Sequence, residues 1–354
     1  MMKRKWLAVG LILFFISVSL TSNISANISV KSLIDNINIE INRINNTRKW
    51  SILFFGGEDS FISMKTPDTN YGSNETTIVR NRYGNDSDDW EMDTLIRFTP
   101  SIPNSVVVVH ATLHLFYWSH GETDPIGRVL NIYRITSDWN ESLVTWDNRP
   151  TVSTELSSNS TVPSTYGYLG WDVTDDVKSF ISEQVENFGW QIMDEHYWGN
   201  NDIPMACFRT KEYNGVSPYL EIDVTTPPET PMRPSGETSG KMGVEYNYTT
   251  STTDADGDLV YYKWDWGDGN FSDWLGPFNP GEKVSASHIW KKGCYEIKVK
   301  AMDDNGAESY SWSEPIEVTM PFSYDVSYMQ FWMKILERFP HAFPLLRFLL
   351  DFNH

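Results

Sequence analysis

The feature that most constrains the fold is a strict alternation of side chains in residues 105–118. Ala111, Leu113, Leu115 and Tyr117 fall on one side of this run, and His110, Thr112, His114 and Phe116 fall on the other. A period of two in a stretch rich in β-branched and aromatic residues predicts a half-buried strand. The chain therefore contains at least one long strand with one face toward a core.

Similar short runs follow the same pattern elsewhere in the first two thirds of the chain. They cover 76–79, 95–98, 128–136, 189–193, 205–210 and 219–224, and Asn, Asp, Gly and Pro separate them. One helix interrupts them, with Thr174 as its expected cap. Its apolar stripe is Val177, Phe180, Ile181 and Val185. Many short strands predict an all-β jelly roll or sandwich for 56–224 rather than an α/β enzyme fold.

The N-terminus indicates export. Lys3, Arg4 and Lys5 precede an apolar run at 7–20, and cleavage after Ala26 would make 1–26 a signal peptide. An uncleaved anchor is the alternative. Residues 27–55 are expected to be a spacer, with a short helix within 28–44. We therefore expect a secreted or cell-surface protein.

Glycosylation sequons agree with export. They begin at Asn27, Asn45, Asn74, Asn85, Asn140, Asn159, Asn247 and Asn270. A chain rich in Asn, Ser and Thr also produces such triplets by chance, so a glycoprotein is one of two interpretations.

The remaining chain divides into three parts. Residues 225–234 contain four prolines and are predicted to be a stiff linker. Residues 235–320 carry strand patterns near 245–249, 259–266, 285–290, 295–301 and 316–319. The tail, 321–354, reads as an amphipathic segment with helical spacing at its start, interrupted by charges. It would attach the chain to a membrane surface, a cell wall or a partner, or pack on its own domain.

Charge and cysteine content exclude several classes of protein. The 354 residues include 28 Lys and Arg against 47 Asp and Glu, for a formal net charge of −19. With a pI near 4.7, the chain lacks the basic surface that nucleic acids require. Its two cysteines, Cys207 and Cys294, cannot form a disulfide scaffold, and we expect both to be buried thiols.

The first β segment contains an ordered set of motifs, which we call the landmark motifs. They are Asp59-Ser60-Phe61-Ile62, Asn70-Tyr71-Gly72, Leu95-Ile96-Arg97-Phe98, Ile102-Pro103, the stretch 137–148 with Trp139, Glu141 and Trp146, Trp171-Asp172-Val173-Thr174, and Phe208-Arg209-Thr210-Lys211-Glu212. This set resembles the DNRLRE domain, also called carbohydrate-binding module family 96. The resemblance implies a β-jelly roll that binds acidic polysaccharide. The module also occurs in archaeal surface proteins similar to disaggregatase, which implies an archaeal source.

The second β segment resembles the PKD domain. The string Trp264-Asp265-Trp266-Gly267-Asp268-Gly269 carries most of this resemblance, and His288-Ile289-Trp290 and Asp304-Asn305-Gly306 follow it in order. The resemblance implies an immunoglobulin-like sandwich of extracellular proteins that acts as a spacer or adhesion module.

The sequence contains no recognisable catalytic motif. It has no HExxH, GxSxG, phosphate loop or GxGxxG pattern. His110 and His114 share a strand face, and a packed or surface pair is favoured over a metal site. A carboxylate pair could hydrolyse glycosides, but 47 acidic residues do not single one out.

Calcium is the metal that the acidic residues allow. Asp254, Asp256 and Asp258 have the spacing of the start of a calcium loop, and an ordinary Asp-Gly turn is the alternative. Asp59 is a candidate ligand for a structural calcium ion in the first module. No cofactor is otherwise required.

A small set of cations and tyrosines could bind an anionic glycan. The candidates are Arg80, Arg82, Arg97, Arg209 and Lys211, with Tyr71 and Tyr83 for stacking on sugar faces. Arg97 and Arg209 lie inside strand runs, where a charge must face solvent or a site. Solvated surface positions are the alternative for each residue. Trp139, Trp146 and Trp171 are expected to build the core.

These observations predict a non-catalytic, exported protein in which the first module binds an acidic matrix polysaccharide and the PKD domain presents it. Two alternatives stay open. The chain could be a polysaccharide lyase or hydrolase of the disaggregatase type, or a structural adhesion protein without glycan binding.

Overall fold

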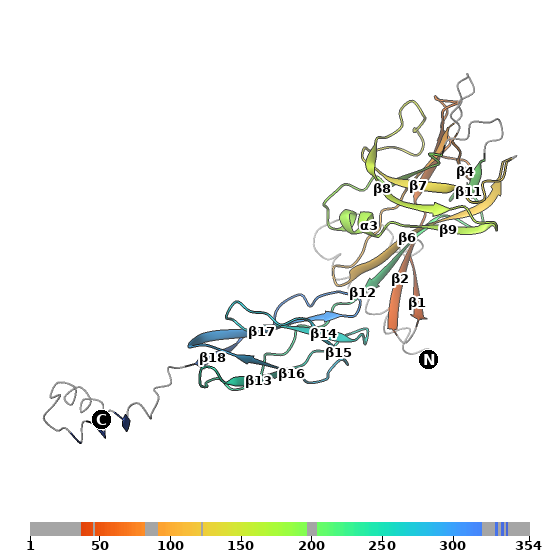
Figure 1. Cartoon of the computed structure of the whole chain (residues 1–354). Helices are drawn as coiled ribbons and strands as arrows, with labels where there is room; N and C mark the ends of the chain where they lie inside the picture. Colours follow the sequence, from red (N-terminus) through yellow and green to blue (C-terminus); the bar gives the residue numbers. More distant parts are fainter. Residues whose placement is uncertain are drawn as a thin grey trace, which may run out of the picture. The chain divides into compact units, whose positions relative to one another are not determined.

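The computed structural model describes residues 37–44, 47–81, 91–121, 123–196 and 204–320, with residues 330, 331, 334, 335 and 338. The chain forms two compact units. The first unit comprises residues 1–227 with 305–307, and the second comprises 228–304 with 308–354 (Figure 1). The proposed signal peptide lies outside the described residues.

The first unit is built from two antiparallel sheets. The seven-stranded sheet has the order β1 (Ile37–Ile44), β2 (Thr47–Phe55), β12 (Tyr219–Thr225), β6 (Val107–His120), β11 (Ala206–Arg209) and β4 (Thr76–Val79), with β9 (Gly167–Asp172) also paired to β6. The five-stranded sheet has the order β3 (Glu58–Ser63), β5 (Met92–Arg97), β10 (Trp190–Met193), β7 (Val129–Ile135) and β8 (Val152–Thr161). This architecture confirms the expected all-β sandwich.

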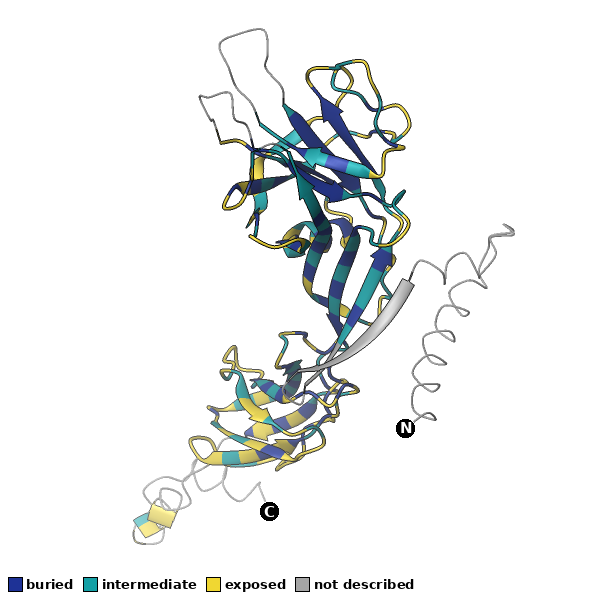
Figure 2. Cartoon of the chain, turned by 90° about the vertical axis from the view of Figure 1, so that its right-hand side faces the viewer, coloured by how far each residue is buried: buried dark blue, intermediate teal, exposed yellow. Residues whose placement is uncertain are grey.

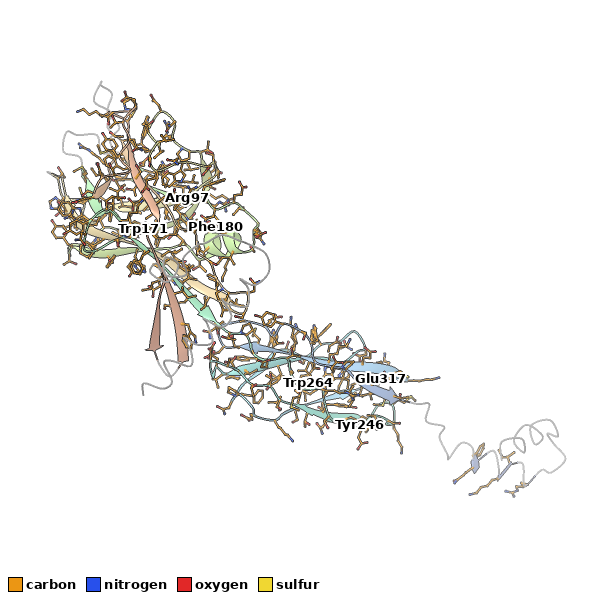
Figure 3. The ribbon with its side chains drawn as sticks, turned by 180° about the vertical axis from the view of Figure 1, so that it is seen from behind. Arg97, Trp171, Phe180, Tyr246, Trp264 and Glu317 are labelled. Carbon is orange, nitrogen blue, oxygen red and sulfur yellow. The ribbon has the colours of Figure 1, made fainter. Side chains whose placement is uncertain are left out.

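The core of the first unit draws on both sheets. Ala111, Leu113, Leu115 and Tyr117 of β6 are buried, as their alternation predicts. Trp171 of β9 is fully buried, and its indole Nε1 donates to the carbonyl of Leu130 in β7, at 3.0 Å. Because β9 and β7 belong to different sheets, this hydrogen bond joins the two layers. The dark strands of Figure 2 mark this interior, and Figure 3 labels Trp171 within it.

The predicted helix is present as α3 (Thr174–Ile181), but its start differs from expectation. Val177 and Phe180 are buried, whereas Ile181 is exposed. Thr174 does not cap the helix: its hydroxyl bonds to the Asp172 carboxylate at 2.6 Å and accepts the backbone N–H of Ala111. The Thr174 hydroxyl therefore connects the start of α3 to β6.

The expected spacer at 27–55, with a short helix within 28–44, is also wrong in its described part. Residues 37–44 and 47–55 are strands, because β1 and β2 form a hairpin and β2 pairs with β12 in the main sheet. Strands β3, β8 and β9 also lacked a recognised pattern. β3 is buried along nearly its whole length and β8 is mostly polar, so neither shows a clean alternation.

The second unit is a smaller β-sandwich. β13 (Glu245–Thr250) pairs with β16 (Val284–Ile289). The other sheet has the order β15 (Leu275–Phe278), β14 (Val260–Asp265), β17 (Gly293–Asp303) and β18 (Ile316–Met320). All but β15 were predicted. Trp264, Trp266 and Trp290 are buried between the sheets, and Figure 3 labels Trp264 there.

The proline-rich segment is not a free linker along its whole length. The backbone N–H of Glu229 donates to Thr253 at 2.9 Å, and that of Met232 donates to Ser251 at 3.0 Å. Ser235 forms a bridge with Thr249. Residues 229–235 therefore pack along the second unit, because their backbone groups find partners there.

The cysteines are both free, and they differ in burial. Cys207 is buried as expected, whereas Cys294 is exposed, which corrects that expectation. Most of the tail lies outside the described residues, although 330, 331, 334, 335 and 338 are helical. Within the described residues, we find no helix with the length and apolar character needed to span a membrane.

A matched pair of glycines in the second unit tests its packing. Gly267 and Gly269 both have positive φ, but a Cβ at Gly267 would lie 2.6 Å from the carbonyl oxygen of Glu296, whereas one at Gly269 would meet nothing. Gly269→Ala should destabilise the unit by about 1–2 kcal/mol through backbone strain alone. Gly267→Ala should destabilise the unit by about 1–3 kcal/mol more, because the new Cβ clashes with the carbonyl oxygen of Glu296. Calorimetric melting of the full chain measures both, and equal effects would contradict this account.

A buried ion pair in the first unit gives a second test. Arg128 and Asp194 are paired, with side chains only 3% exposed. Asp194→Asn leaves the guanidinium without its carboxylate and should destabilise the first unit by about 3–5 kcal/mol. The exposed Glu155 on β8 is the control, because Glu155→Gln should leave the melting temperature unchanged. An unchanged melting temperature for Asp194→Asn would show that the pair is dispensable.

Candidate functional site

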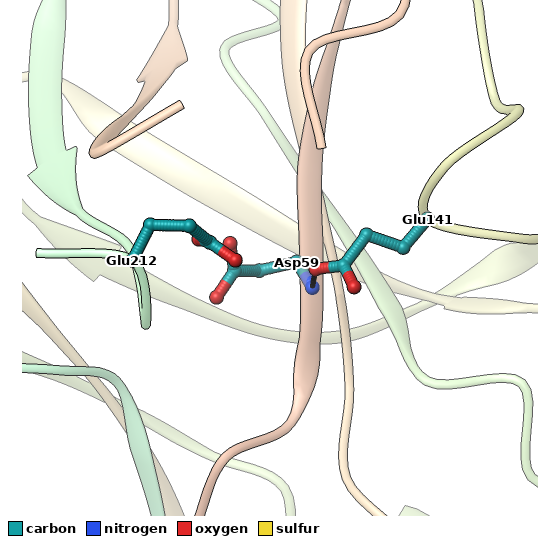
Figure 4. A group of neighbouring side chains, drawn as sticks. All are labelled: Asp59, Glu141 and Glu212. Atoms are coloured by element: carbon teal, nitrogen blue, oxygen red, sulfur yellow. Dashed lines mark hydrogen bonds between the residues drawn. The ribbon is translucent and has the colours of Figure 1, made fainter. Parts of the chain in front are cut away.

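Several landmark motifs, distant in sequence, meet at one cluster of charged groups. Asp59 lies on β3, Glu141 on the loop between β7 and β8, and Lys211 and Glu212 on the turn after β11. One carboxylate oxygen from each of Asp59, Glu141 and Glu212 lies within 4.8 Å of the other two. Figure 4 shows Glu212 and Glu141 approaching Asp59 from different segments. We call these three residues the carboxylate cluster.

Hydrogen bonds tie the carboxylate cluster to the backbone. The N–H of Lys211 donates to Asp59 Oδ2 at 3.0 Å, and the N–H of Asp59 donates to Glu141 Oε1 at 2.9 Å. The Lys211 ammonium pairs with Glu141 and lies 3.4 Å from Glu212 Oε1. Burial, reinforced by the negative charge of Glu212, raises the pKa of Asp59 to about 8. One ammonium thus faces three carboxyl groups.

The motif Asn70-Tyr71-Gly72 holds the Glu141 loop in place. The amide of Asn70 donates to the carbonyl oxygens of Glu141 and Val144, both at 2.7 Å. Gly72 lies so close to the Glu141 backbone that a Cβ would clash with it. Tyr71 stacks on Phe61 with ring centroids 4.0 Å apart, so it supports the cluster from within the fold.

Arg97 does not face solvent as a free cation. It pairs with Glu58 and Asp138 and donates to the carbonyl oxygen of Trp139 at 3.1 Å. Its side chain is only 15% exposed. Arg97 lies on β5 of the five-stranded sheet, whereas Arg209 lies on β11 of the other sheet. The two arginines therefore do not form one cationic patch.

The other predicted binding and core residues have separate surroundings. Arg80 forms a bridge with Met92 beside β5 and is half-buried. Arg82 and Tyr83 lie outside the described residues. Trp139 and Trp171 are buried as expected, but Trp146 is only half-buried, and the exposed Arg149 guanidinium lies 4.4 Å from its ring centroid.

The outer face of the seven-stranded sheet carries a continuous group of rings that sequence reasoning missed. We call it the aromatic face, and its members are Phe55, His114, Phe116, Trp118, Tyr168 and Tyr219. Cross-strand register brings Tyr219 opposite both Phe55 and His114, and Phe116 opposite Tyr168. The outward positions of the 105–118 alternation were the available signal, but their partners on other strands were not evident.

Five of the six rings of the aromatic face contact one another directly, and Trp118 contacts Arg209. Tyr219 stacks on His114 with centroids 4.4 Å apart, and Tyr168 meets Phe116 edge-on at 5.1 Å. Tyr168 is 42% exposed. His114 Nε2 lies 3.0 Å from Glu221, and His110 lies 3.5 Å from Asp172. The two histidines thus face different carboxylates, which agrees with a surface pair.

Arg209 lies at one end of the aromatic face between two rings. Its guanidinium carbon is 3.5 Å from the Trp118 ring centroid and 3.7 Å from that of Tyr213. Among the described residues, no carboxylate lies within ion-pair distance of it. The rings of Trp118 and Tyr213 therefore hold the cation in place, and no carboxylate of the described residues neutralises its charge.

The Asp254 turn of the second unit is stabilised by its own backbone. Asp254 Oδ1 accepts the N–H groups of Asp256, Gly257 and Asp258 at 2.9, 3.0 and 3.1 Å. The three aspartates also have oxygens within 4.8 Å of one another. Burial raises the pKa of Asp258 to about 6. The hydrogen bonds account for the Asp-Gly turn, and calcium at this turn stays a prediction.

Comparisons with solved structures match both parts of the chain and the PKD segment by itself. A PKD domain of an M14-like peptidase from Thermoplasmatales archaeon SCGC AB-540-F20 is 45% identical, over 28% of this chain and 99% of that one, with a TM-score of 0.26. A β-1,2-glucanase from Parabacteroides distasonis is 9% identical over 82% and 35%, with a TM-score of 0.20. The FN1–FN3 domains of chicken CNTN1 are 10% identical over 80% and 98%, with a TM-score of 0.21.

No curated protein matches the chain. Family models match two consecutive segments: the model of carbohydrate-binding module family 96 matches residues 54–224, and the PKD domain model matches residues 225–319. Both families are non-catalytic kinds of domain that are typical of extracellular or surface proteins. The chain is therefore built from a carbohydrate-binding module of family 96 followed by a PKD domain.

Proposed function

We propose that the first module binds a polysaccharide chain along the aromatic face, without cleaving it. The observation that carries this proposal is the row of rings across β2, β12, β6 and β9. The apolar C–H faces of sugar rings pack on aromatic side chains, and polar groups nearby fix their orientation. A row of rings that spans four strands suits a chain with several sugar units.

Arg209 supports an acidic glycan as the ligand. A guanidinium pairs with a carboxylate through two parallel hydrogen bonds, and a sugar carboxylate is the group that an anionic polysaccharide offers. Arg209 has no such partner among the described residues, and the rings of Trp118 and Tyr213 fix the position of its guanidinium. A uronic acid unit would place its carboxylate here.

The rest of the aromatic face supports contacts with sugar hydroxyls. Glu221 beside His114 and Asp223 beside Ser51 are hydrogen-bond acceptors on the same face. Carboxylates accept hydrogen bonds from hydroxyl groups but repel a second anion. The proposed ligand therefore has its acidic group at the Arg209 end and its hydroxyls toward Glu221.

Surface display completes the proposal. We propose that the chain is exported and that the PKD domain and the tail present the binding module at the cell surface. The sequon residues Asn74, Asn140, Asn159, Asn247 and Asn270 are all exposed, which supports glycosylation after export.

A chain ending at Met320 should lose cell association if the tail attaches the protein to the cell. An archaeal source stays a prediction.

The contribution of Arg209 can be measured directly. Arg209→Met keeps the aliphatic bulk and removes the charge, so affinity for soluble polyuronate should fall by about tenfold to a hundredfold. Arg149→Met is the matched control, because Arg149 also stacks on a tryptophan but lies away from the aromatic face. Equal affinities for wild type and Arg209→Met in calorimetric titration would refute the assignment.

The stacking contribution of Tyr168 gives an independent test. Tyr168→Ala removes an exposed ring while Gly170 and Trp171 of the same strand stay in place, so retention on immobilised polysaccharide should fall by about tenfold. The exposed Tyr310 of the second unit is the control, as Tyr310→Ala. Unchanged retention of Tyr168→Ala would contradict the aromatic face as the binding surface, and no retention of the wild type would favour a structural adhesion protein.

Cleavage is tested on the same substrates. Incubation of the full chain with polyuronate should release no new reducing ends and no unsaturated sugars, since we propose a binding module. Release of either product would favour the alternative of a hydrolase or a lyase. A parallel digestion with a known polyuronate lyase provides the positive control for the assay.

A further inference from the structure

The carboxylate cluster of the first module has an imbalance of charge that its own contacts do not resolve. Three carboxyl groups surround a single ammonium, that of Lys211. Asp59 is only 2% exposed. Its Oδ1 is buried without a hydrogen-bond partner, as is Glu212 Oε2. Buried carboxylate oxygens that lack a partner are expensive unless a cation compensates for them.

We propose that Asp59, Glu141 and Glu212 form a calcium site in the first module. Each contributes an oxygen within 4.8 Å of the other two. All three donors are carboxylates, which are the ligands of a hard divalent cation rather than of zinc or copper. The three residues come from three separate segments of the chain. Calcium tolerates an irregular arrangement of ligand atoms better than magnesium does. Lys211 would then move its ammonium away from Glu141.

The position of this site connects it to the aromatic face. Glu212 is followed at once by Tyr213, whose ring covers Arg209, and the N–H of Tyr213 donates to Thr210 at 3.3 Å. Asp59 also accepts the N–H of Lys211 in the same turn. A bound ion would therefore fix residues 209–213, and calcium should strengthen glycan binding. This consequence, unlike the site itself, rests on the proposed function.

Titration of the full chain with calcium chloride, after treatment with a chelator, tests the site. Wild type should bind with a Kd of about 10⁻⁴–10⁻³ M, the range of extracellular modules. Asp59→Asn and Glu212→Gln should weaken this binding at least tenfold. Glu186→Gln is the matched control at an exposed glutamate, and Asp254→Asn separates any ion bound by the second unit.

Melting of the wild type in calcium or magnesium gives a second readout. Calcium chloride should raise the melting temperature of the first unit more than magnesium chloride does, because an ion that binds the folded state stabilises it. Each variant is melted in chelator to establish that it folds. The proposed site would be overturned if the wild type does not bind calcium. It would also be overturned if Asp59→Asn and Glu212→Gln bind calcium as tightly as the wild type does.

Retention on covalently immobilised polyuronate separates the two proposals. Chelator should reduce retention of the wild type and leave that of Glu212→Gln, which is already low, unchanged. If wild type binds calcium but its retention ignores the chelator, the link through residues 209–213 is wrong and the site stands. If nothing is retained under any condition, the proposed glycan function fails while the calcium result is unaffected.

Discussion

The carboxylate of Asp59 lies at the start of β3, buried where three distant segments of the first module meet. Because a buried carboxylate needs donors or cations around it, this one residue requires Lys211 and its neighbours to approach from the turn after β11. Glu141, held by Asn70, approaches Asp59 from the loop between β7 and β8. The landmark motifs that contain Asp59, Asn70, Glu141 and Lys211 are thus parts of one electrostatic arrangement.

This arrangement also shapes the surface. The turn at 209–213 begins at the end of β11 in the seven-stranded sheet, passes the carboxylate cluster and returns Tyr213 over Arg209. Arg209 is thereby kept rigid beside the aromatic face. Pre-organised groups lose little entropy when they bind a ligand, so such a turn suits recognition of a flexible chain. The buried cluster and the proposed glycan surface share one short segment.

Sequence patterns predicted the strands whose two sides have different surroundings. β6 alternates because its inner residues pack in the core and its outer residues form the aromatic face. β3 is buried on both sides and β8 on neither, so their sequences lack a period. The sequence of β1 predicts part of a helix, because scattered apolar positions fit more than one period until a neighbouring strand pairs with them.

Composition, alternation and motifs by themselves determined the all-β class, the two modules and the residue types available for glycan and cation binding. Tertiary structure alone decided the partner of each charge: Arg97 is neutralised by Glu58 and Asp138, whereas Arg209 is held between rings and has no ion-pair partner among the described residues. The same holds for the aromatic face, whose rings come from four strands. Local pattern reports which side of a strand is buried, but the partner of a charge or a ring depends on strand order and register, which nonlocal pairing sets.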